Sequence, residues 1–181
     1  MSPLATPGPG RRGPALVQGK HIPVLTVRQP WAWALQHGKP VENRPWEMTY
    51  RGLLWLHAGA RSRWDPAGAD SGLVQDEWLQ VTGLPDVPHG IAKDIGLHRN
   101  THLMVFGAVT ALLQVTGCHH ADDCTRRGSP CNPWAACGQW HIERQVLHVL
   151  PEPVPCRGML GLWRLPEDAE NAVRAQLEEH L

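Results

Sequence analysis

The sequence has no uninterrupted apolar run of 18 residues, which is the length that a membrane-spanning helix requires. Arg11 and Arg12 are not followed by an apolar segment, so no signal peptide is predicted. The chain also has no net charge, with 17 basic and 17 acidic residues. A protein without a general positive field must bind nucleic acid through a local basic patch, if it binds nucleic acid at all.

Several common enzyme motifs are missing as well. There is no Gly-x-Ser-x-Gly elbow, no phosphate-binding loop and no dinucleotide fingerprint, which argues against the usual hydrolases, kinases and dehydrogenases. The five cysteines occur without a secretory signal, and this favours a reducing, cytoplasmic location over a disulfide framework.

Tyrosine and phenylalanine occur once each, whereas tryptophan occurs nine times. Most of the tryptophans are expected in the core because each buries a large area, and a minority are expected to stack on flat ligands. A length of 181 residues suits one domain with a real core.

Residues 1–21 are rich in proline and glycine and are predicted to be a disordered tail. A short strand is expected over residues 23–27. Pro30 and Gly38 then stand where the first helical residue and the terminating glycine of a two-turn helix would be. Its buried face should hold Trp31 and Leu35, with Ala34 as a further candidate.

Short strands dominate the rest of the chain. They are predicted over residues 53–58, 105–115, 140–150 and 161–165, with residues 151–155 as an extended connector. Helices are expected over residues 76–82 and in the C-terminal segment 166–181, where Ala172, Val173 and Leu177 share one face. Residues 60–103 are interpreted as a loop-rich insertion, and residues 116–138 as a loop rich in cysteine and histidine. This pattern predicts an α+β fold, a small mixed β-barrel with flanking helices.

Lys39, Glu42 and Arg44 form a charged turn directly after the first helix. If residues 42–44 are extended, Glu42 and Arg44 project to the same side. A carboxylate beside two cations offers both hydrogen-bond acceptors and donors. Such a set can bind a ligand that also carries both, such as a nucleobase edge with a phosphate. The alternative is an ion-pair cluster on a solvated turn.

Three motifs in this region resemble the ASCH domain family, which is related to the PUA-type RNA-binding barrels. They are Arg28-Gln29-Pro30-Trp31, Lys39-Pro40-Val41-Glu42-Asn43-Arg44 and Tyr50-Arg51-Gly52. The resemblance covers about residues 22–165 and implies a PUA-like barrel in a stand-alone bacterial member of the family.

The resemblance implies RNA or a modified nucleoside or nucleotide as the ligand, in a cleft between barrel and helix. No obligate protein partner is expected. Gln29 either lines the cleft or caps the helix, one of Trp31 and Trp33 is core while the other can stack, and His57 is either structural or an acid–base group. The expected ligand-binding residues are Gln29, Trp31, Lys39, Glu42, Arg44, Trp46, Arg51 and His57.

Two other functions remain open from the sequence. Some bacterial relatives are amidohydrolases that use a lysine and a threonine in this turn, and here Glu42 stands at the threonine position. An enzyme would then be a metal-independent hydrolase of RNA or a modified nucleoside, with Lys39 and Glu42 activating water. The third possibility is a protein-interaction module that acts as a coregulator.

The loop from Cys118 to Cys124, together with Cys131, Cys137 and His141, contains enough soft ligands for zinc. Its intervals are not those of a regular pair of Cys-x-x-Cys motifs. The sequence therefore favours reduced, unliganded cysteines and no cofactor, with zinc on Cys118, Cys124, Cys131 and Cys137 as the alternative.

Overall fold

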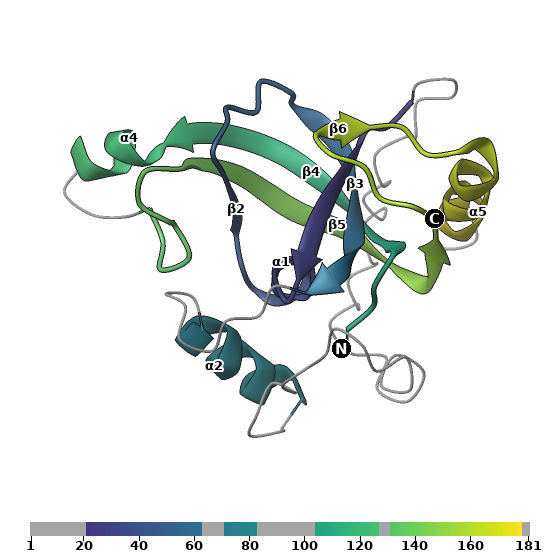
Figure 1. The fold of residues 1–181 in the computed structure, drawn as a ribbon, viewed down its shortest axis with the longest axis horizontal. Helices are drawn as coiled ribbons and strands as arrows, with labels where there is room; N and C mark the ends of the chain where they lie inside the picture. Colours follow the sequence, from purple (N-terminus) through teal and green to yellow (C-terminus); the bar gives the residue numbers. More distant parts are fainter. Residues whose placement is uncertain (1–20, 63–70, 83–103, 127–130, 179–181) are drawn as a thin grey trace, which may run out of the picture.

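The computed structural model describes residues 21–62, 71–82, 104–126 and 131–178 (Figure 1). Within these ranges a single sheet of six strands curls into a half-barrel, accompanied by a few helices. Residues 1–20 of the predicted tail, and most of the predicted insertion at 60–103, lie outside the described residues. The prediction of an α+β fold built on a curled sheet is confirmed at this level.

The strand order across the sheet is β2-β5-β4-β3-β1-β6. Strand β1 is parallel to β3, and the other neighbours are antiparallel. The strands are β1 Val24–Gln29, β2 Val41–Arg44, β3 Gly52–Ser62, β4 Ala108–His120, β5 Trp140–Pro155 and β6 Leu162–Trp163. The segments predicted at 23–27 and 53–58 are therefore strands, and the closing strand is shorter than predicted.

The helices are α1 Trp31–His37, α2 Ser71–Thr82, α4 Ala121–Arg126 and α5 Glu167–Glu178. Helix α1 begins after Pro30 and ends at Gly38, as predicted. Gly38 has a φ of 144°, which only glycine adopts readily, so the chain can leave the helix sharply there. Among the helices of the described residues, none combines the length and apolar character needed to cross a bilayer.

Strand β3 contributes core side chains on both faces of the sheet, because consecutive side chains of a strand point to opposite sides. Trp55 packs with β1, β4 and α5, whereas Leu54 and Leu56 pack with α1. Helix α5 contributes Val173 and Leu177 as predicted, but the third buried residue is Ala169. Ala172 is exposed, since a stripe with a spacing of four residues leaves it on the solvent side.

The core tryptophan of α1 is Trp33 rather than Trp31. Trp33 is almost fully buried and lies 5.3 Å from Trp78 of α2, measured between ring centroids. Trp31 is only half-buried at the edge of the core. The prediction that one of the two tryptophans is core and the other partly open is thus confirmed, but with the roles exchanged relative to the predicted buried face.

The largest difference from the sequence prediction concerns the long β4–β5 pair. Strand β4 runs on to His120 and is followed by α4, so the first part of the predicted loop 116–138 is strand and helix. Strand β5 likewise continues through the predicted connector to Pro155, which pairs with Ala108. Beyond residue 143, β5 has no β2 partner on its other side, so prolines are tolerated at that edge.

Candidate ligand-binding site

The charged segment predicted as a turn is strand β2 at one edge of the sheet. Glu42 pairs with Ile142 of β5, and Asn43 pairs with His141. Side chains alternate along a strand, so Glu42 and Arg44 project to one face and Asn43 to the other. Ile142 belongs to the core beneath α1. The carboxylate of Glu42 therefore lies on the face of the sheet that packs against α1, and it shares this face with Arg44, as the sequence predicted for extended residues 42–44.

Glu42 is the centre of a buried ion-pair cluster. Its Oε1 lies 3.0 Å from Arg44 Nη2, and its Oε2 lies 3.5 Å from Lys39 Nζ. The Lys39 ammonium also donates to the Val41 carbonyl at 2.7 Å, and Arg44 Nη2 donates to the Thr26 carbonyl at 2.9 Å. The Lys39 side chain is 2% exposed, whereas that of Arg44 is 24% exposed. The cluster is therefore deep at Lys39 and opens to solvent at Arg44.

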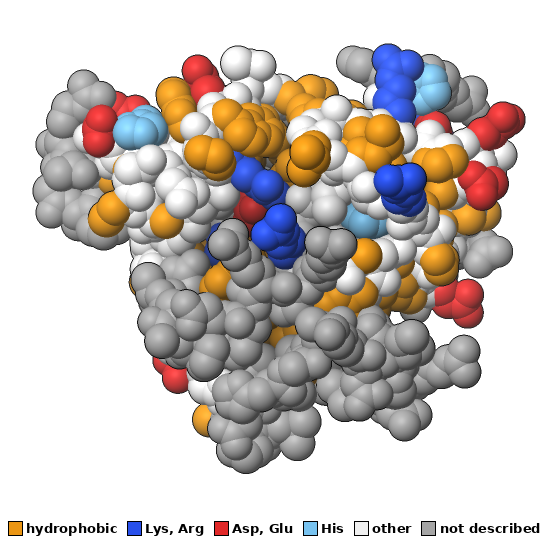
Figure 2. Space-filling view, viewed as in Figure 1, with side chains coloured by type: hydrophobic (Ala, Val, Ile, Leu, Met, Phe, Trp, Pro, Cys, Tyr) orange, Lys and Arg blue, Asp and Glu red, His pale blue; other side chains and the backbone are white. Residues whose placement is uncertain are grey.

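A third cation, Arg144 of β5, belongs to the same cluster but has no signal in the sequence. Burial lowers the pKa of the Arg144 guanidinium to about 10, opposed by the attraction of the Glu42 carboxylate. Arg144 thus stays charged at neutral pH. Glu42 therefore has two direct ionic contacts, with Lys39 and Arg44, and is also attracted by Arg144. On the face shown in Figure 2, basic side chains (blue) lie around a small acidic patch (red) in a hollow of the surface.

Some N–H groups of the two arginines in this cluster lack acceptors. In the described part of the chain, no acceptor lies within hydrogen-bond distance of the buried Nε of Arg44, or of the buried Nε and Nη2 of Arg144. A buried polar group without a partner costs free energy, so such donors mark a place where an acceptor is expected to bind. The unused N–H groups of two charged guanidinium groups favour an anionic ligand.

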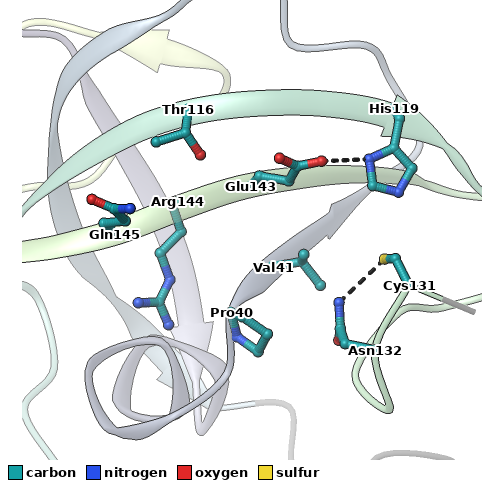
Figure 3. Close-up of a pocket in the computed structure, with 9 residues that line it drawn as sticks. All are labelled: Pro40, Val41, Thr116, His119, Cys131, Asn132, Glu143, Arg144 and Gln145. Atoms are coloured by element: carbon teal, nitrogen blue, oxygen red, sulfur yellow. Dashed lines mark hydrogen bonds and ion pairs between the residues drawn. The ribbon is translucent and has the colours of Figure 1, made fainter.

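A pocket of about 330 Å³ lies beside this cluster (Figure 3). Arg144 extends from β5 toward Pro40 on one side of the pocket, and His119, Cys131 and Glu143 lie on the other. Lys39, Glu42 and Arg44 do not line it. Arg144 therefore links the buried ion pairs to an open space.

Several of the other predicted ligand-binding residues lie outside the ion-pair cluster. Gln29 is buried, accepts the Trp33 N–H of the first turn of α1 and donates to Val105, so its alternative as a helix cap is confirmed. Arg51 is exposed and bonds the carbonyls of residues 48 and 50. Trp46 is half-buried against the core beneath α1, as Trp31 is.

His57 is fully buried next to the cluster. Its partner in the β1–β3 register is Thr26, whose carbonyl accepts the Arg44 bond. The Nε2 of His57 donates to the Cys156 carbonyl at 3.0 Å, and its Nδ1 has no hydrogen-bond partner among the described residues. The imidazole also packs edge-on against Trp163. These contacts make His57 a structural residue in its neutral form.

Stability should therefore fall on acidification through His57. Burial lowers its pKa below the ordinary value of 6.5, opposed by the Cys156 hydrogen bond. Because the folded state disfavours the charged imidazole, the free energy of unfolding has its full value above about pH 6.5. It decreases as the pH falls from there toward the folded-state pKa. Urea unfolding between pH 7 and 5 should show a decline that is shallower in His57→Gln. The same slope in both proteins would contradict this role.

The structure also gathers metal-ligating side chains, though not the four cysteines named above. Cys118 and Cys137 lie outside the group. Cys118 is next to His119 on β4, and neighbouring residues of a strand point to opposite faces. The group consists of His119, Cys124, Cys131 and His141. Their intervals match no common zinc motif, and the two histidines meet only through the pairing of β4 with β5.

A scan against protein-family models finds no match for this chain, and a search of curated proteins finds none either. The function of the site is therefore inferred from its geometry and from the motifs in the sequence.

Proposed function

We propose that this protein is a PUA-like domain of the ASCH family that binds a nucleotide, either free or as a single unstacked residue of an RNA. The phosphate would lie against Arg44 and Arg144, and the base near Glu42 and a tryptophan. The curled sheet and the grouping of Lys39, Glu42 and Arg44 support the family assignment. All five cysteines are unpaired, which supports a reducing, cytoplasmic location.

One observation carries the proposal, namely the buried N–H groups of Arg44 and Arg144 that find no acceptor among the described residues. Arginine presents a planar set of donors that matches the oxygens of a phosphate. Glu42 fixes the direction of Arg44 through the 3.0 Å contact. The oxygens of a phosphate would supply the missing acceptors.

The tryptophans near the site provide a surface for the base. Trp31 and Trp46 are each half-buried at the edge of the core, so part of each ring is open to a ligand. Stacking of a base on an aromatic ring stabilises a complex by about 1–3 kcal/mol. The zero net charge of the chain favours one nucleotide over a long strand.

The contacts of Glu42 favour binding over hydrolysis. Both of its oxygens are engaged, one by Arg44 and the other by Lys39. A general base must have a lone pair directed at the attacking water. The Lys39 ammonium in turn donates to Val41. These contacts already use both groups to hold the cluster together, and we expect no turnover.

A combined thermal-shift and turnover screen tests the proposal. Nucleoside monophosphates should raise the Tm, the matching nucleosides should raise it less, and none of them should be consumed. Acetylated nucleosides and short RNAs belong in the same screen. Consumption of any of these would favour the hydrolase alternative, whereas the absence of any shift would remove the support for a ligand site.

A further inference from the structure

Four metal-ligating atoms converge beside the β4–β5 pair. His119 Nε2 lies 3.0 Å from Cys124 Sγ and 3.3 Å from His141 Nδ1. His141 Nδ1 in turn lies 3.4 Å from Cys124 Sγ and 3.5 Å from Cys131 Sγ. All four donor atoms lie within 4.8 Å of one another. Two imidazoles and two thiols form a complete set of four ligands.

Hydrogen bonds on the far side of each ring determine which nitrogen faces the group. His119 Nδ1 lies 2.8 Å from the Glu143 carboxylate (Figure 3), and His141 Nε2 lies 2.8 Å from the Ala136 carbonyl. Both partners are acceptors, so the ring protons sit on these outer nitrogens. The nitrogens that face the group then carry lone pairs. A hydrogen bond of this type, from the ring nitrogen that does not bind the metal, orients most metal-bound histidines in proteins.

We propose that His119, Cys124, Cys131 and His141 bind one zinc ion. A tetrahedral zinc with nitrogen and sulfur ligands separates its donor atoms by roughly 3.3–3.8 Å, close to the distances between these side chains. Each thiol loses its proton to solvent on binding, and the two thiolates neutralise the ion. Because four protein ligands leave no open position, this zinc is structural.

The surroundings fit a thiolate–imidazole site. Asn132 Nδ2 donates to Cys131 Sγ at 3.2 Å, which stabilises negative charge on the sulfur. Glu143 stands behind His119 as the carboxylate of a carboxylate–histidine pair. Two thiolates with two imidazoles in a tetrahedral arrangement select zinc over metals that prefer oxygen ligands or planar coordination.

The ion would join four segments of the chain. Its ligands come from the end of β4, from α4, from residue 131 and from the start of β5. The segment after Cys131 also holds strand β2, because Asn43 Nδ2 donates to the Trp134 carbonyl and the Ala136 N–H donates to Asn43 Oδ1. Zinc therefore fixes the edge strand that carries Glu42 and Arg44.

Metal analysis and cobalt substitution of the full chain test the site independently of any nucleotide. The purified protein should contain about one equivalent of zinc. The cobalt form should show intense visible bands of tetrahedral geometry and a thiolate charge-transfer band. Chelation should lower the Tm by at least about 5 °C and speed hydrogen exchange in residues 41–44.

Matched cysteine variants separate the site from its neighbours. Cys131 and Cys137 are both exposed, but only Cys131 belongs to the group. Cys131→Ser should lose the charge-transfer intensity and most of the zinc, whereas Cys137→Ser should retain both. Glu143→Gln should weaken zinc binding by about 10–100-fold with the same stoichiometry. Less than about a tenth of an equivalent of zinc in the unaltered protein, stoichiometric iron in its place, or equal metal loss in both cysteine variants would overturn the proposal.

Discussion

Replacing Glu42 by glutamine should lower the free energy of unfolding by about 3–5 kcal/mol, since removal of one partner leaves buried charges uncompensated. Glu42 is in direct contact with both Lys39 and Arg44. Glutamine keeps the size of the side chain and removes its charge, so the loss reports electrostatics rather than packing. Urea denaturation, with the midpoint and slope fitted together, measures this change.

Glu47→Gln is the matched control for this prediction. Glu47 lies five residues away and is exposed, so its variant should stay within about 0.5 kcal/mol of the unaltered protein. Adding phosphate should restore part of the stability lost in Glu42→Gln, because an anion can replace the missing charge. A loss below about 1 kcal/mol would mean that the Lys39–Glu42–Arg44 cluster is solvated like a surface ion pair.

Replacing Arg144 by glutamine should weaken the binding of a nucleoside monophosphate by about 10–100-fold. The change removes hydrogen bonds between charged groups, each worth about 1.5–3 kcal/mol, and tenfold in affinity corresponds to about 1.4 kcal/mol. The stability of the ligand-free protein should change by less than about 1 kcal/mol, since Arg144 forms no direct ion pair among the described residues. Calorimetric titration measures the affinity, and urea unfolding measures the stability.

Two controls sharpen the Arg144 experiment. Arg164 is exposed and takes no part in the cluster, so Arg164→Gln should leave the affinity unchanged. Arg144→Lys keeps the charge but loses the planar pair of donors, and most of the affinity should be lost with them. Equal weakening by Arg144→Gln and Arg164→Gln would point to a diffuse charge effect instead of a defined phosphate site.

The local parts of the fold could be predicted because short-range chemistry determines them. Pro30 and Gly38 mark the ends of α1, and the apolar run of β3 is a strand because it is buried on both faces. The shared face of Glu42 and Arg44 followed from the alternation along a strand. These features depend on residues within a few positions of one another.

The remaining features depend on contacts between distant parts of the chain. Arg144 joins Glu42 only because β2 pairs with β5, about a hundred positions away, and no local pattern in the sequence indicates this pairing. The strand character of residues 116–120 likewise comes from pairing with β5. The same pairing brings His119 opposite His141, so the sequence did not indicate that these two histidines group with Cys124 and Cys131.

The central claim is that the Lys39–Glu42–Arg44–Arg144 cluster binds the phosphate of a nucleotide. Titration calorimetry of the unaltered protein with a nucleoside monophosphate, and with the parent nucleoside at the same ionic strength, tests it most directly. The phosphate should improve the affinity by about 10–100-fold, and added salt should reduce that difference. Equal affinities for nucleotide and nucleoside, or binding of neither, would contradict the claim.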